Sequence, residues 1–264
     1  MVRNMKRFLL GDQDHIEKDT FIWNLTASML VSLQTALYLL VISHTSGVVD
    51  AGIFSIASAH AYLLQTVAKF GMRAYQVSDT SQKYSARDYL NSRYITGLLM
   101  ILSTGIYLIF AARYRGYSGY KITVILCVVI MRLTDAIEDV FHGMLQQIGR
   151  LDIGSKALAI RLAVTIIIFT MIQFSRNLPA ALMISTVISI PLLVLLTRLS
   201  LGPFIDQIAL DTGNNKFDNQ SCQNVKELLI SCIPLAISAF LTIYLSNAPK
   251  YAIDKIYNEE VQAY

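Results

Sequence analysis

Long apolar stretches recur along the chain, and short polar segments separate them. A helix of about 20 apolar residues crosses the ~30 Å hydrocarbon core of a bilayer. By this criterion the sequence predicts seven membrane spans, at 22–43, 48–68, 94–112, 121–142, 157–174, 178–198 and 227–247. We therefore expect an all-α fold, a polytopic membrane helix bundle of about seven transmembrane helices.

The second span is the least hydropathic, but it is rich in small residues. Alanine, serine and glycine three or four positions apart let helices approach closely in lipid, so this span is predicted to pack inside the bundle. The sixth and seventh spans contain Pro191 and Pro234. Bilayer helices tolerate such prolines, either as packing kinks or as bends used in gating.

The composition agrees with a membrane protein and gives no support to catalysis. Charged residues make up 15% of the chain and the mean hydropathy is +0.49, whereas soluble domains carry roughly 25% charged residues. The three cysteines have no metal-ligand spacing, so we expect no metal and no cofactor. Nucleophile-elbow, phosphate-loop and zinc-protease motifs are missing, which argues against an enzyme. The net charge of +4 is scattered, and we expect no nucleic-acid partner.

Lysine and arginine are distributed unevenly between the two sets of predicted loops. If the N-terminus is cytoplasmic, the inner segments hold fourteen of these residues and the outer segments hold six. Because cytoplasmic loops are enriched in both residues, the N-terminus is predicted inside. An odd number of spans then places the C-terminus outside.

The fourth predicted span carries most of the ionisable groups found at membrane depth. At 100° per residue, one face of this helix presents Arg132, Asp135, Asp139, His142 and Gln146, and Glu138 flanks that face. Charges inside a bilayer usually line a cavity or pair with one another. The spacing also predicts an i,i+3 ion pair between Arg132 and Asp135. A second interpretation stays open, in which the helix leaves the membrane near Leu133 and its carboxylates are solvated.

Further polar residues within the predicted spans include Asn24, Gln34, His60, Gln65 and Arg161. His60, near the middle of the second span, is either a hydrogen-bonded packing group or a proton carrier. Arg161, near the inner end of the fifth span, is expected to extend toward lipid headgroups.

Three segments carry a resemblance to a known family. They are Gly71-Met-Arg-Ala-Tyr-Gln-Val-Ser-Asp79 with Lys83-Tyr-Ser85 and Arg93, then 141–152 after the fourth span, and the terminal 247–255. They resemble bacterial polysaccharide flippases, which transport O-antigen, capsule or teichoic units and belong to the multidrug/oligosaccharidyl-lipid/polysaccharide exporter superfamily. Such transporters consist of two pseudo-symmetric six-helix lobes around a central cavity.

The resemblance implies a transporter in the bacterial inner membrane that flips an undecaprenyl-diphosphate-linked oligosaccharide during cell-surface polysaccharide biosynthesis, including that of lipopolysaccharide. Its implied mechanism is alternating access of the two lobes. Its implied partners are the lipid-linked oligosaccharide, membrane lipids and polysaccharide assembly proteins. On this interpretation 1–200 is the first lobe, 201–226 a cytoplasmic interlobe connection and 227–264 the incomplete start of the second lobe, so the chain looks like an N-terminal fragment.

The candidate site residues follow from the fourth span and from the implied diphosphate. Arg132 and Arg73 are the candidate cations for the diphosphate, and Asp135, Glu138, Asp139 or His60 are candidates for coupling to protons or sodium. Two alternatives stay open: a multidrug cation exporter of the same superfamily, whose cavity should hold carboxylates with little net positive charge, and a non-transporting membrane scaffold.

Overall fold

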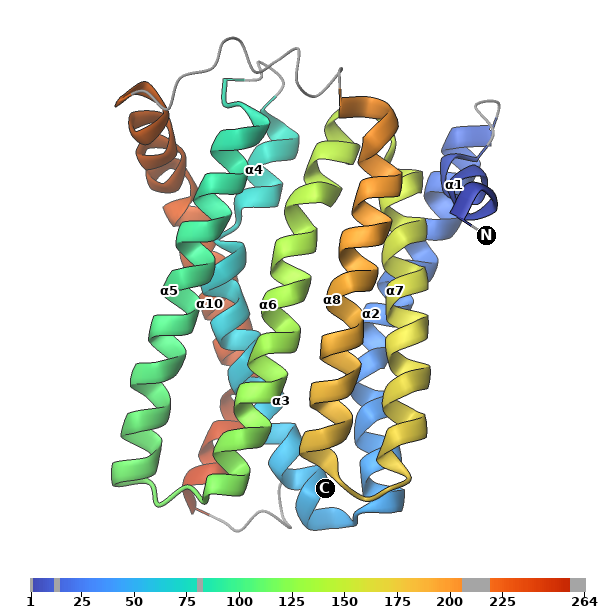
Figure 1. Ribbon diagram of the computed structural model, residues 1–264. Helices are drawn as coiled ribbons and strands as arrows, with labels where there is room; N and C mark the ends of the chain where they lie inside the picture. The colour runs from blue at the N-terminus through green and yellow to red at the C-terminus, as the bar shows by residue number, and fades with distance from the viewer. Residues whose placement is uncertain (1, 12–14, 80–82, 206–218, 257–264) are drawn as a thin grey trace.

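In the part of the chain that the structure describes, seven long helices run side by side in alternating directions (Figure 1). The computed structural model describes residues 2–11, 15–79, 83–205 and 219–256. The long helices are α2 (Ile16–Thr45), α3 (Val48–Lys69), α5 (Ala86–Tyr114), α6 (Gly119–Gln147), α7 (Leu151–Gln173), α8 (Leu178–Leu201) and α10 (Asn219–Ile256). Three short elements accompany them: α1 (Val2–Leu10), α4 (Met72–Ser78) and the 3₁₀ turn η2 (Gly202–Phe204). No strand occurs in the described ranges, and the predicted all-α fold is confirmed.

Six of the seven long helices are long and apolar enough to cross a membrane, which indicates a multi-pass membrane protein. The exception is α6, because Lys121, Arg132 and its three carboxylates lower its apolarity. Nevertheless α6 lies inside the bundle, where it packs against α3, α5, α7 and α8. Its charges are therefore enclosed by other helices rather than exposed to lipid.

The predicted spans coincide with the seven long helices, and only the fifth extends past its helix, by one residue. The short helices α1 and α4 were not predicted. Of the predicted interlobe connection, 206–218 lies outside the described residues, and 219–226 forms the first turns of α10. Residues 257–264 also lie outside the described part. The predicted orientation, N-terminus inside and C-terminus outside, stays a prediction.

Local sequence signals fix several helix ends. Ser85 caps α5 and forms a reciprocal capping box with Asp88, while the Ser118 hydroxyl accepts a hydrogen bond from the Lys121 amide at the start of α6. Asn177 caps α8, whose first turn also contains Pro179. Each of these three helices therefore starts at a residue whose side chain satisfies a free backbone N–H group.

The chain turns sharply between α3 and α4. Phe70 and Gly71 both adopt left-handed backbone conformations, with φ of 50° and 64°. A Cβ atom on Gly71 would lie 2.5 Å from the Leu235 Cβ of α10, so the residue must lack a side chain. This corner ends α3 at Lys69 and starts α4 just before Arg73, so that one cation lies on each side of it.

The bundle has an apolar half and a polar half. The apolar half contains the largest hydrophobic cluster, in which Tyr38 of α2 stacks on Phe169 of α7 with ring centroids 3.8 Å apart. The small residues of α3 pack here and are buried, as the sequence predicted: Ala51, Gly52, Ser55, Ala57, Ser58, Ala59 and Ala61. The polar half lies toward α4 and the start of α2, at the upper end of Figure 1.

Candidate functional site: a charged cavity in the helix bundle

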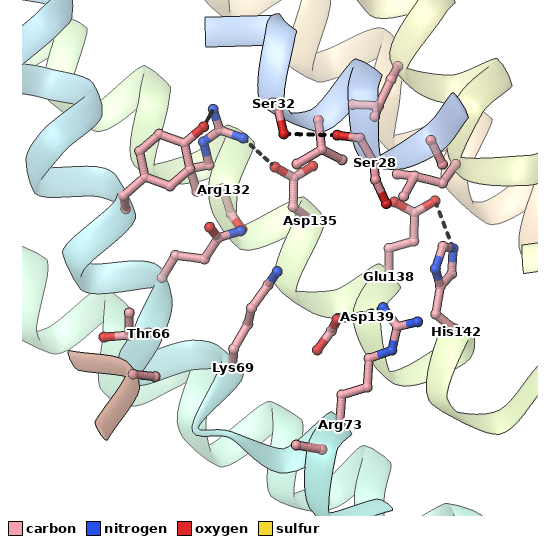
Figure 2. A pocket seen from close by; sticks show the side chains of 18 of the residues that line it. Ser28, Ser32, Thr66, Lys69, Arg73, Arg132, Asp135, Glu138, Asp139 and His142 are labelled. Carbon is pink, nitrogen blue, oxygen red and sulfur yellow. Dashed lines mark hydrogen bonds and ion pairs between the residues drawn. The ribbon is translucent and has the colours of Figure 1, made fainter. Parts of the chain in front are cut away.

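A cavity of about 620 Å³ occupies the polar half of the bundle. Its walls come from α2, α3, α4, α6, α7 and α10, and many of the lining side chains are hydroxyls and amides. These uncharged polar residues are Asn24, Ser28, Ser32, Gln34, Tyr62, Gln65, Thr66 and Ser155. The volume lies within the roughly 300–1,000 Å³ typical of small-ligand pockets. Figure 2 shows the charged side chains converging on this space from α3, α4 and α6.

Arg132 is held by a dense set of contacts on the cavity wall. Its guanidinium forms an ion pair with Asp135 at 3.0 Å, as the i,i+3 spacing predicted. It also donates hydrogen bonds to Gln34 Oε1 (3.2 Å) and Thr35 Oγ1 (2.9 Å) of α2, and to the Tyr62 hydroxyl of α3 (2.8 Å). The guanidinium carbon lies 4.2 Å from the centroid of the Tyr62 ring. Arg132 therefore ties α2, α3 and α6 together.

Arg161 of α7 compensates two carboxylates of α6. Its Nε donates to Glu138 Oε2 at 2.9 Å and its Nη2 donates to Asp135 Oδ1 at 2.7 Å, while Nη1 donates to the Ser189 hydroxyl of α8. Only 2% of Arg161 is exposed. The expectation that Arg161 extends to lipid headgroups is wrong, because the carboxylates of α6 attract its guanidinium into the bundle.

Asp139, one turn further along α6, also has two arginine partners. Arg93 of α5 lies 3.1 Å from its Oδ2 atom, and Arg73 of α4 lies 3.5 Å from its Oδ1 atom. Arg73 makes a second hydrogen bond to Gln146 Oε1 at 3.1 Å. These contacts fasten α4 and α5 to α6, and they leave each of the three carboxylates of α6 paired with at least one arginine.

Lys69, the last residue of α3, differs from the arginines described above because it forms no ion pair among the described residues. Figure 2 shows its side chain extending into the space between Asp135 and Asp139. It is partly buried and lines the cavity, yet it has neither a hydrogen bond nor an ion pair within the described part of the chain. The described residues that line the cavity hold three cations, Lys69, Arg73 and Arg132, and three carboxylates. Arg93 and Arg161 do not line it, but each pairs with carboxylates of α6, so among these residues Lys69 is left without an ion pair.

His60 does not line this cavity. It lies in the other half of the bundle, where its Nε2 atom is 2.6 Å from the Tyr107 hydroxyl and its ring stacks on Tyr251 of α10. Beyond it, Asp254 forms ion pairs with Lys121 at 2.7 Å and Arg115 at 3.3 Å, and accepts a hydrogen bond from Tyr117. Burial, together with this hydrogen bond, raises the pKa of Tyr117. This second cluster fastens the end of α10 to the α5–α6 connection.

The structure tests one part of the two interpretations of the fourth span, namely whether its carboxylates are solvated, and the point at which the helix leaves the membrane stays a prediction. Helix α6 is continuous from Gly119 to Gln147, and the exposed fractions of the Glu138 and Asp139 side chains are 5% and 10%. The interpretation in which these carboxylates are solvated is therefore wrong, because neighbouring helices enclose them. Arg132, Asp135, Asp139 and Arg73 all line the cavity, and their roles in binding stay predictions.

Sequence reasoning missed Lys69, and it missed Arg93 and Arg161 as partners of the carboxylates of α6. Lys69 is the last residue of α3, the helix whose small residues predicted an inner position. A lysine at the end of an inner helix was the available sign that a cation lies inside the bundle. The partners Arg93 and Arg161 had no comparable signal, because the pairing of charges on different helices depends on how each helix is rotated about its axis.

Comparison with known proteins adds one distant relative. No protein-family model matches the chain, and no solved structure matches it. A capsular polysaccharide biosynthesis protein of Staphylococcus aureus, CapF, is 27% identical over 245 residues. The match covers 90% of this chain but 57% of CapF, so the chain spans little more than half of that relative. The similarity agrees loosely with a place in polysaccharide biosynthesis.

Proposed function

We propose that this chain forms part of a bacterial inner-membrane flippase that moves an undecaprenyl-diphosphate-linked oligosaccharide for cell-surface polysaccharide biosynthesis. The observation that carries the proposal is Lys69, a cation that projects into the cavity and forms no ion pair among the described residues. A partly buried cation without a direct salt bridge favours the binding of an anionic ligand.

The remaining walls suit the other part of such a substrate. Serine, threonine, asparagine and glutamine side chains offer donors and acceptors for sugar hydroxyls around the charged centre. The name of the distant relative, which refers to capsular polysaccharide biosynthesis, supports the same class of cargo. Membrane lipids and polysaccharide assembly proteins are the proposed partners.

A multidrug cation exporter is less compatible with this charge arrangement. A cationic drug requires a carboxylate that is free to pair with it. Asp135, Glu138 and Asp139 are each already paired with arginine, and Lys69 would repel a second cation.

The test is ligand binding by the purified chain in lipid nanodiscs. We expect undecaprenyl diphosphate to bind more tightly than uncharged undecaprenol, and Lys69→Gln to weaken diphosphate binding roughly tenfold, or about 1.4 kcal/mol. Lys83→Gln is the matched control, because Lys83 is exposed and lies outside the cavity. Equal binding of the two lipids, or preferential binding of a quaternary ammonium drug, would overturn the proposal.

A further inference from the structure

His142 is a buried cavity residue whose ring nitrogen has no partner. It lies on α6, lines the cavity and is 5% exposed. Its Nε2 atom makes no hydrogen bond within the described residues. The nearest carboxylate oxygen is Glu138 Oε1, one helical turn away at 4.0 Å, which is too far for a hydrogen bond. A buried polar atom without a partner is costly and calls for an explanation.

Glu138 has one oxygen committed to Arg161 and one directed at His142. Both Nε and Nη2 of Arg161 donate to Oε2, whereas Oε1 accepts no hydrogen bond among the described residues. If the neutral imidazole carries its hydrogen on Nδ1, then Nε2 holds a lone pair that faces Oε1, and two acceptors oppose each other. A proton on Nε2 would turn this opposition into a charge-assisted hydrogen bond.

Burial and the neighbouring cations both oppose a positive charge on the His142 ring. Lys69 from α3, Arg73 from α4 and Arg161 from α7 are cations facing this region, and Glu138 and Asp139 are the carboxylates on α6 itself. Cations disfavour a further positive charge on the ring. An anion entering the cavity would neutralise part of that field and lower the cost of charging the imidazole.

We propose that His142 takes up one proton on Nε2 when an anion occupies the cavity, with Glu138 Oε1 as the acceptor of the new hydrogen bond. The proton comes from water and adds to the Nε2 lone pair, while Nδ1 keeps its hydrogen. This inference rests on the proposed function, because it requires an anionic cargo. Since linkage is reciprocal, acidification then tightens binding of the anion, and release of the anion returns the proton. His142 is thus a coupling residue of the cavity.

Calorimetry with farnesyl diphosphate as the probe tests this coupling. Titration of the full chain at pH 7 in two buffers of different ionisation enthalpy gives the number of protons taken up on binding. We expect the wild type to take up more protons per bound probe than His142→Gln, whose value reports the ionisation of the diphosphate itself. In His60→Gln, which alters a buried histidine outside the cavity, the uptake should match the wild type.

A direct measurement avoids dependence on the folding of any variant. The ¹⁵N signals of the wild-type imidazole rings distinguish a protonated Nε2 from one with a lone pair, and one ring should change state when the probe is added. Equal proton uptake in the wild type and in His142→Gln overturns the role of His142 and leaves the proposed function intact. A wild type that binds no diphosphate probe overturns both.

Discussion

The Oε2 atom of Glu138 on α6 accepts a hydrogen bond of 2.9 Å from the Nε atom of Arg161 on α7, in a part of the bundle from which solvent is nearly excluded. Removing one member of a buried ion pair leaves the other charge without compensation. Arg161 was predicted from the sequence to extend toward lipid headgroups. This ion pair explains why it instead lies inside the bundle and stabilises the packing of α7 against α6.

Arg161→Met should therefore destabilise the fold strongly, by about 3–5 kcal/mol, because both Glu138 and Asp135 lose a partner. Thermal unfolding in detergent measures the loss. Lys83→Met is the control, since the exposed Lys83–Glu227 pair should contribute at most about 1 kcal/mol. A similar loss of stability in the two variants would contradict a stabilising role of the buried Arg161 ion pairs.

Arg132→Ala and Lys69→Gln should separate stability from binding. Arg132 connects three helices through Gln34, Thr35 and Tyr62, so its loss should lower the unfolding temperature as well as diphosphate binding. Lys69 makes no internal ion pair in the described ranges, so its substitution should weaken binding and leave the unfolding temperature near that of the wild type. Thermal unfolding and a diphosphate-binding assay on both variants give the comparison. An Arg132→Ala protein that unfolds at the wild-type temperature would refute the stabilising role of Arg132.

Gly71→Ala should damage the corner between α3 and α4. The residue has φ of 64°, and the added Cβ would approach the Leu235 Cβ to 2.5 Å and the Leu235 carbonyl carbon to 3.1 Å. Backbone strain and overpacking together should destabilise the protein by about 2–4 kcal/mol. Gly105→Ala on α5 is the matched control, because nothing lies within 4 Å of its added Cβ. Thermal unfolding should show the loss at Gly71 and little change at Gly105.

Asp254→Asn should loosen the end of α10 opposite the cavity. The substitution removes the carboxylate charge next to Lys121, whose side chain is 5% exposed, and we expect a loss of about 3 kcal/mol. Spin labels on α10 and on the α5–α6 connection should show a broader distance distribution than in the wild type. The same pair of labels in Asp50→Asn, which alters an exposed contact with Tyr120, should report the wild-type distribution.

The helices of this bundle could be predicted from the sequence because long apolar runs are a local property of the chain. The small residues of the second span also predicted its inner position correctly. The corner at Phe70 and Gly71 could not be predicted from apolar runs. Helix α4, which follows the corner, has no apolar run of its own that would separate it from α3. What excludes a side chain at position 71 is Leu235, more than a hundred residues further along the chain.

The candidate site could be predicted only in part. The polar face of α6 and its Arg132–Asp135 pair follow from helical periodicity alone. Which residues of neighbouring helices form ion pairs with α6 depends on how each helix is rotated about its axis. The length and position of the apolar runs do not specify that rotation. For this reason Arg93 and Arg161 were missed as counter-ions, and His60 was grouped with residues from which the structure separates it.

The ionisable face of α6 also has a consequence for how the chain enters its membrane. A charge at the bilayer centre costs at least about 2.5–3.5 kcal/mol by insertion scales, so α6 is a poor candidate for partitioning into lipid alone. Arg161, the counter-ion of Glu138, lies 23 residues further along the chain, beyond the tight turn at Gly149. It is therefore synthesised only after α6 is complete. We expect α6 and α7 to leave the insertion machinery as a hairpin, so a nascent chain cut after Gln147 should leave α6 outside the bilayer.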